Sequence, residues 1–216
     1  MGGFARVERE ALADTLVRVG PDAPTLCTGW TAADLAAHLV IREGRPIASM
    51  GIVVKPLAGL TRRVQTVTRE RTPFETLVER VRKGPPPWSA FKIGPLDTAG
   101  NTIEYFVHHE DLRRAAGDGP RELDPAQSDD LWNRLRRQAK LTFRSVPVGV
   151  TLVRAERGDS PRQTVVAKAA TPLMVTVTGS AGELVLFAAG RKDAARVELT
   201  GDDAAVARLR AAKLGI

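Results

Sequence analysis

Two of the three histidines in this 216-residue chain are adjacent, within the acidic segment EYFVHHEDLRRA at positions 104–115. On a helix, Glu104 and His108 are one turn apart and share a face, and Asp111 follows on that face. His109 points about a quarter-turn away. Apolar residues occupy neighbouring angles, so Glu104 and His108 lie at or beside the buried stripe. Burying a carboxylate and an imidazole is costly unless they pair or bind a cation.

The third histidine, His38, lies in the apolar helical segment DLAAHLVIREG. The alanines beside it leave room for another group to approach. Two helices of a bundle, each with its polar residue directed inward, can bring His38 to Glu104 and His108. Two imidazoles and one carboxylate are a ligand set suited to Zn²⁺ or a similar divalent ion, and they leave coordination positions for water or a substrate.

A metal is not the only interpretation of these residues. His108 can be a partly exposed helix histidine paired with Glu104, and His38 can be a satisfied core histidine. An E-x3-H spacing on a helix is also common by chance. For Asp111 we expect a supporting role or a place at the helix surface instead of direct ligation.

The residues around this trio carry weaker signals. For His109 and Glu110 we expect a solvated helix face. Arg42 follows His38 by four residues, so it borders the pocket or pairs with a neighbouring helix. Cys27 is the single cysteine, which excludes an internal disulfide framework. It precedes the helix that carries His38, and a small core thiol is favoured over a place near the site.

The elements that must position these residues are helical up to about residue 145. Apolar spacing with start and stop signals predicts helices over 4–20, 31–44, 72–84, 98–116 and 126–144. Thr31 and Asp34 resemble a capping box with Asp in place of Glu. Thr72 is the expected N-cap of the third helix.

The pattern changes near Pro147. The β-branched runs VGVTLVRAERG and QTVVAKA, separated by turn residues, predict a hairpin. LMVTVTG predicts another strand, SAGELVLFAAGR a short helix, ARVELTG a last strand and DDAAVARLRAAKL a last helix. The sequence therefore predicts an α+β protein with a helical bundle over residues 1–145 and a small α+β domain over residues 146–216.

Composition limits the classes of function. Hydrophobic residues make up 43%, enough for a core, and the net charge of +7 suits phosphates or other anions. The chain has no compact Lys/Arg run with interleaved aromatics, so nucleic-acid binding is not favoured. The N-terminus lacks a signal-peptide pattern, and no apolar run approaches the roughly 20 residues of a membrane span. We expect a cytoplasmic protein without a membrane segment; its oligomeric state is not indicated.

Three motifs, in order, carry a family resemblance. GWTAADLAAHLV resembles the W-x3-D-L-x2-H-L signature of the mycothiol-dependent maleylpyruvate isomerase family. NTIEYFVHHEDLRRA resembles its second element, and VTVTGSAGELVLFAAGRKDAARVELTGD its small C-terminal domain. The resemblance covers nearly the whole chain and is nearest to a subgroup of actinobacterial metal-binding proteins that carry EYFVHHED. The first motif is formed by Trp30, Asp34, Leu35, His38 and Leu39.

The resemblance implies a DinB-like helical bundle with His38, Glu104 and His108 as ligands of a divalent metal, usually zinc. It also implies mycothiol, a low-molecular-weight thiol, as cosubstrate. The metal would hold the thiol as a thiolate, and a transferase or isomerase would direct that thiolate at a small electrophile. Arg191 matches the family's GR element and is a candidate catalytic residue, or alternatively a cation at a helix C-terminus. The alternative function is non-catalytic metal binding or sensing.

Overall fold

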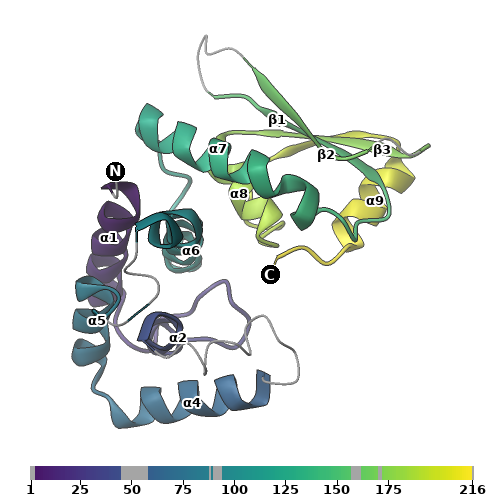
Figure 1. The fold of residues 1–216 in the computed structure, drawn as a ribbon. Coiled ribbons are helices and arrows are strands. Elements are labelled where there is room, and N and C mark those ends of the chain that lie inside the picture. Colours follow the sequence, from purple (N-terminus) through teal and green to yellow (C-terminus); the bar gives the residue numbers. More distant parts are fainter. Residues whose placement is uncertain are drawn as a thin grey trace. The chain divides into compact units, whose positions relative to one another are not determined.

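The computed structural model describes residues 3–44, 58–87, 89, 94–156, 162–169 and 172–215 (Figure 1). These residues contain eight helices and a four-stranded sheet, which confirms the expected combination of helices and strands. The chain divides into two compact units, Met1–Gly119 and Pro120–Ile216. Each unit is described by itself below.

The first unit is built from helices. α1 packs on α6 and α5, while α2 packs on α4 and α5. The predicted helices of this region are confirmed within a few residues, although α6 begins four residues earlier than expected. The bounds are α1 (Gly3–Val19), α2 (Ala32–Gly44), α4 (Ala58–Arg71), α5 (Phe74–Lys83) and α6 (Gly94–Ala115). A DinB-like arrangement of these helices stays a prediction.

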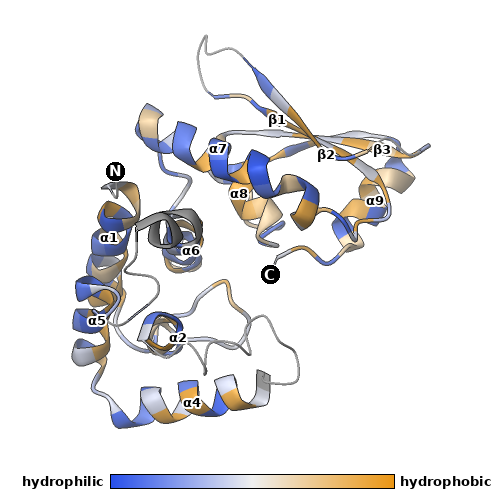
Figure 2. Cartoon of the chain, in the orientation of Figure 1, coloured by the Kyte–Doolittle hydropathy of each residue, from blue (hydrophilic) through white to orange (hydrophobic). Residues whose placement is uncertain are grey.

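Helix α4 is not predicted by the sequence pattern. Its buried positions include the polar residues Thr61, Gln65 and Thr68, while Leu60 and Val67 are exposed. Figure 2 shows hydrophilic and hydrophobic residues mixed along this helix. A sequence pattern predicts an amphipathic helix only when its apolar residues form the buried face. In α4 several polar residues are buried and two large apolar residues are exposed, so the pattern does not predict it.

Aliphatic side chains fill the core of the first unit. They come from α1, α2, α5 and α6, and several alanines in α1 and α2 allow the backbones to approach closely. The largest fully buried members are Leu12, Leu16, Leu35, Leu39, Leu77, Tyr105 and Leu112. This composition agrees with the low aromatic content of the chain, 5%.

The start of α2 is fixed as expected. The Thr31 N–H donates to the Asp34 carboxylate at 3.0 Å, and the Asp34 N–H donates to the Thr31 hydroxyl at 3.3 Å. The predicted capping box is therefore confirmed. At α5 the expectation is wrong, because Pro73, with ψ at 142°, is itself the N-cap and no side chain caps the helix.

The second unit places helices against a mixed sheet of strand order β2-β1-β3-β4. β1 pairs antiparallel with β2, which confirms the predicted hairpin, and parallel with β3. β3 pairs antiparallel with β4. The bounds are α7 (Pro125–Thr142), β1 (Gly149–Arg154), β2 (Gln163–Lys168), β3 (Met174–Gly179), α8 (Ala181–Ala188), β4 (Glu198–Gly201) and α9 (Asp203–Ala211).

Helix α7 belongs to the second unit, so the division at 119/120 differs from the expected boundary at 145/146 by one helix. α7 packs on α8 and β2. Arg154 of β1 also donates to two α7 residues, to Asp129 at 2.6 Å and to Ser128 at 3.1 Å. The sequence pattern predicts that α7 belongs to the helical bundle. Periodicity shows which face of a helix is buried but not which elements that face packs against.

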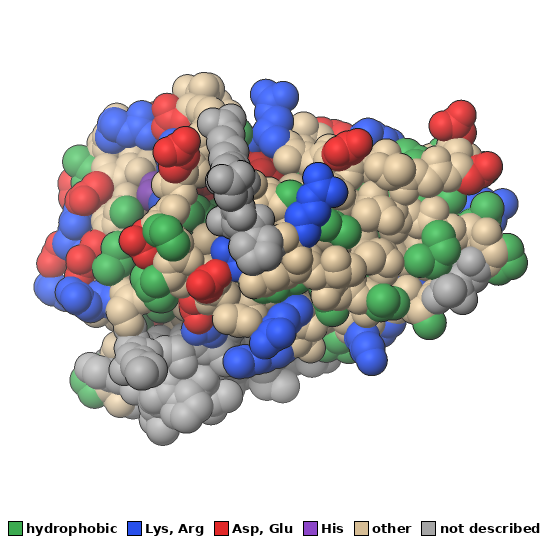
Figure 3. All heavy atoms as spheres, turned by 90° about the horizontal axis from the view of Figure 1, so that it is seen from above, with side chains coloured by type: hydrophobic (Ala, Val, Ile, Leu, Met, Phe, Trp, Pro, Cys, Tyr) green, Lys and Arg blue, Asp and Glu red, His purple; other side chains and the backbone are tan. Residues whose placement is uncertain are grey.

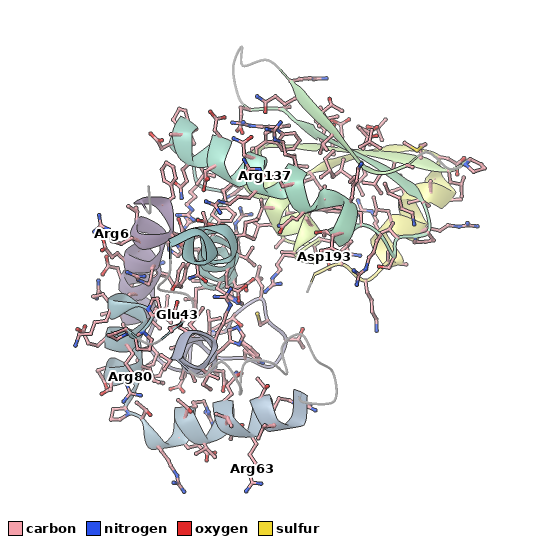
Figure 4. All side chains as sticks on the ribbon, in the orientation of Figure 1. Arg6, Glu43, Arg63, Arg80, Arg137 and Asp193 are labelled. Carbon is pink, nitrogen blue, oxygen red and sulfur yellow. The ribbon has the colours of Figure 1, made fainter. Side chains whose placement is uncertain are left out.

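Charged side chains of both signs are interspersed on the face drawn in Figure 3. Arg6, Arg63 and Arg80 lie on three different helices and point outward (Figure 4). Among the described residues, no helix has the length and apolar character needed to cross a membrane.

Candidate metal centre

Helices α2 and α6 bring the three predicted ligands together, although His38 and Glu104 are 66 residues apart in the sequence. The His38 Nε2 atom lies 3.4 Å from Glu104 Oε1, and His108 Nε2 lies 3.2 Å from the same oxygen. One ligand atom from each of the three side chains lies within 4.8 Å of the other two. Both imidazoles are buried.

These separations fit a tetrahedral metal ion. Zinc bonds of about 2.0 to 2.1 Å to nitrogen and oxygen place neighbouring ligand atoms about 3.3 Å apart. The two nitrogen-to-oxygen distances of 3.2 and 3.4 Å match that spacing, and they are equally those of direct imidazole–carboxylate hydrogen bonds. The residues present could hold a divalent metal.

The electrostatic surroundings favour a cation between the three groups. Burial lowers the pKa of His38 below its ordinary value, which keeps its imidazole in the neutral form that binds metals. Burial alone would raise the pKa of Glu104, but hydrogen bonds from His108 and His38 and the charge on Arg42 hold it well below its ordinary range. The carboxylate is thus ionised and ready to act as a ligand.

His108 is surrounded by acceptors. Burial would lower its pKa, but hydrogen bonds to Asp111, Cys27 and Glu104 raise it well above its ordinary value. Without a metal, the imidazole therefore carries a positive charge between two carboxylates. A divalent ion would supply that positive charge in its place.

The sequence leaves open whether Arg42 borders the candidate site or pairs with a neighbouring helix. In the structure it does both. Its Nε atom lies 3.4 Å from Glu104 Oε1. One terminal nitrogen donates to the Asn101 side-chain oxygen at 2.5 Å. Arg42 thereby ties α2 to α6 beside the candidate ligands.

Trp30 forms an aromatic wall next to the imidazoles. Its ring centroid lies 5.0 Å from that of His38, and the His38 and His108 rings meet edge to face at 5.3 Å. The sequence motif contains Trp30, but helical spacing alone gives it no role, because it lies in the segment before α2.

Asp111 and Cys27 form a second layer behind His108. The fully buried Asp111 carboxylate lies 2.9 Å from His108 Nδ1 and accepts from the Cys27 thiol at 3.2 Å. Cys27, His108 and Asp111 are themselves close enough to hold a metal ion. Burial excludes the helix-surface place for Asp111, and its supporting role stays a prediction. Cys27 lies beside His108 and Asp111 and not in the core cluster.

His109 does not face solvent, so the expectation of a solvated face is wrong. Only 4% of the residue is exposed. Its Nδ1 lies 2.7 Å from the Glu8 carboxylate and its Nε2 lies 2.9 Å from the Thr15 hydroxyl. Both partners belong to α1, which covers this side of α6.

Glu110 is also buried, with no exposed surface. It accepts from Arg113 at 2.8 Å and from Arg114 at 2.7 Å, both within the next turn of α6. The expectation of a solvated face is wrong here as well. The buried charge is tolerated because two guanidinium groups neutralise it.

Arg191 follows α8 in the second unit and lies outside the groups described above. One of its terminal nitrogens donates to the backbone carbonyl of Ala189 at 2.7 Å. That contact is the one expected of a cation at a helix C-terminus. A catalytic role for Arg191 stays a prediction.

Comparison of the chain with protein-family models, with curated proteins and with solved structures found no match. The resemblance to the mycothiol-dependent maleylpyruvate isomerase family therefore rests on the sequence motifs alone. The geometry of the trio is independent of that resemblance.

Proposed function

We propose that this protein binds a divalent metal ion, zinc by preference, through His38, Glu104 and His108. The observation that carries the proposal is the pair of 3.2 and 3.4 Å separations between imidazole nitrogens and one carboxylate oxygen. Two imidazoles and a carboxylate suit zinc, and three protein ligands leave a position for a small molecule, as in catalytic zinc sites.

We further propose that the small molecule is a low-molecular-weight thiol, with mycothiol suggested by the motifs. A bound divalent metal stabilises the thiolate form, which is the nucleophile in transfer to, or isomerisation of, a small electrophile. In the chain itself, the Trp30 ring lies beside that of His38, and hydrogen bonds from His108 and His38, together with the charge on Arg42, keep the pKa of Glu104 low. A catalytic role for Arg191 is suggested by the GR motif alone.

The metal proposal is tested by the metal content of purified protein and of His38→Ala, Glu104→Ala and His108→Ala. We expect near-stoichiometric metal in the wild type and its loss in each variant, with the circular dichroism spectrum retained. His109→Ala is the matched control and keeps its metal, because His109 faces α1. Wild-type protein that takes up no metal on reconstitution overturns the proposal.

The thiol proposal needs a separate measurement, because metal content cannot distinguish an enzyme from a metal-binding or sensing protein. Cobalt-loaded protein is titrated with the thiol, and a saturable sulfur-to-cobalt absorption band is expected. Conjugation is then assayed across a panel of electrophiles. Metal-loaded protein that binds no thiol and conjugates nothing rejects the enzyme and leaves the non-catalytic alternative.

A further inference from the structure

The contact between Asp111 and His108 is made by a carboxylate oxygen that acts as an acceptor. Asp111 Oδ2 accepts from the Cys27 thiol at 3.2 Å and lies 2.9 Å from Nδ1 of His108, so Nδ1–H is placed to donate to it. The other ring nitrogen, Nε2, then faces Glu104 at 3.2 Å. Asp111 behind the ring thereby leaves Nε2, and not Nδ1, as the nitrogen that would exchange its proton for a metal beside Glu104.

Asp111 is in turn held by the segment between α1 and α2. The Leu26 N–H donates to the Asp111 backbone carbonyl at 3.1 Å, and the Cys27 thiol donates to its carboxylate at 3.2 Å. The hydroxyl of Thr25 braces this segment from within, accepting from the Cys27 N–H and contacting the Trp30 carbonyl, both at 3.1 Å. The support behind His108 is therefore a braced loop and not a single side chain.

We propose that Asp111 is a positioning residue that fixes the plane and the protonated nitrogen of the His108 ring, with Cys27 holding Asp111 in place. This inference rests on the proposed metal site and specifies how that site is preorganised. Carboxylates that hold a metal-binding histidine from behind typically contribute a factor of about 10 to 100 in metal affinity. Asp111 therefore acts on the metal through His108 without binding it.

A competing arrangement uses the same three side chains as ligands. Cys27, His108 and Asp111 lie close enough to one another to bind a cation by themselves. That arrangement requires Nδ1 of His108 to be deprotonated, and the hydrogen bond to a fully buried carboxylate opposes this. The two arrangements predict different behaviour for Cys27, because only the second makes the thiol a ligand.

The test compares Asp111→Asn, Asp111→Leu and Cys27→Ser with His108→Ala. Zinc affinity is measured by competition with a chromophoric chelator, and the His108 imidazole N–H is followed by ¹H–¹⁵N NMR. We expect about 10-fold weaker zinc binding in Asp111→Asn and a larger loss in Asp111→Leu. Cys27→Ser is expected to bind zinc within a few-fold of the wild type, since Cys27 contacts His108 and Asp111 from behind the ring and is not itself a ligand in this arrangement.

The NMR measurement does not depend on metal binding. An exchange-protected Nδ1–H of His108 is expected in wild-type protein with or without zinc, and Asp111→Leu should lose it. If wild-type protein binds no zinc, the metal proposal fails, yet this resonance still decides whether Asp111 fixes the ring. The inference is overturned if Asp111→Asn binds zinc as tightly as the wild type does. It is also overturned if the Nδ1–H of His108 exchanges freely in the wild type. Loss of zinc in Cys27→Ser equal to that in His108→Ala overturns it too. Should Asp111→Leu not fold, Asp111→Asn and Cys27→Ser decide the outcome.

Discussion

His108 and His109 are consecutive, yet they serve different parts of the molecule. Successive residues of a helix point about 100° apart, so one imidazole is directed at α2 and the other at α1. His108 contacts Glu104 and Asp111. His109 lies between Glu8 and Thr15, and this buried contact joins α1 to α6.

We expect His108→Ala to remove the metal and His109→Ala to lower the stability of the fold while the metal is kept. His109→Ala removes the imidazole that contacts the buried Glu8 carboxylate and the Thr15 hydroxyl, and we expect a loss of roughly 1 to 3 kcal/mol in the free energy of unfolding, because removing one partner of a buried polar contact is costly. Metal stoichiometry should be unchanged. Denaturant titration and metal analysis of the same preparations check both parts. His109→Ala protein that is as stable as the wild type but lacks metal would contradict the assignment.

The sequence anticipates which ligands meet but not what supports them. Helical spacing places Glu104 and His108 on one face of their helix. His38 lies within the apolar sequence of a second helix, and a bundle can direct both of these faces inward. The contact of Cys27 with Asp111 joins a loop to a helix 84 residues away, and no periodicity describes it. The burial of Glu110 is equally hidden, since charge at a helix position normally signals solvent.

At the scale of elements, one ion network fastens α7 to the sheet. Arg154 is at its centre and donates to Asp129 and Ser128 of α7 and to Glu156, which follows β1. The Glu156 carboxylate also accepts from the Ser128 hydroxyl at 2.6 Å and from the Ala181 N–H at the start of α8 at 3.2 Å. Two helices and a strand thus share one carboxylate.

This network predicts a loss of stability in acid. Burial opposes ionisation of Glu156, but the hydrogen bonds from Ser128, Arg154 and Ala181 hold its pKa below the ordinary value of 4.5. A carboxyl whose pKa is lower in the folded state stabilises the fold above the unfolded-state pKa. That contribution disappears as the pH falls from about 4.5 through the folded-state pKa.

We therefore expect Glu156→Gln to lower the free energy of unfolding by roughly 1 to 2 kcal/mol near neutral pH, since Glu156 is partly exposed and its charge-assisted hydrogen bonds are weakened by solvent. The difference from the wild type should shrink as the pH falls below about 4.5, because the carboxyl is protonated first in the unfolded chain and then, at lower pH, in the folded protein. Denaturation curves of both proteins across this range provide the measurement. A difference that stays constant with pH would show that the carboxylate charge is not what stabilises the network.

Element prediction succeeds where burial follows the apolar pattern and fails where it does not. The helices over α1, α2 and α7 and the hairpin of β1 and β2 have clear periodicity and turn residues, and the sequence locates them closely. α4 is missed because Thr61, Gln65 and Thr68 face inward. Its position depends on tertiary contacts such as the ion pair between Arg69 and Asp34 at 3.2 Å, which a local pattern cannot show.

At the scale of the whole molecule, the two compact units predict which fragments fold. Residues 120–216 include α7, whereas residues 146–216, the domain expected from the sequence, omit it. We expect the longer fragment to give a dispersed NMR spectrum and cooperative unfolding. The shorter one should aggregate or remain unfolded, because it lacks the buried α7 side chains Leu131, Trp132 and Leu135. Equal folding of both fragments would place the boundary at 145/146 after all.

The central segment of α6 has a consequence for how this protein tolerates genetic change. Residues 105–112 are all buried, so the helix lacks the free side on which substitutions normally accumulate. Saturation mutagenesis should find that substitutions are poorly tolerated at every position of this segment. In a surface helix, by contrast, the sensitive positions recur every three to four residues. Sequence change near the candidate ligands would then have to come from other parts of the chain, such as the loop that carries Trp30, while α6 stays fixed.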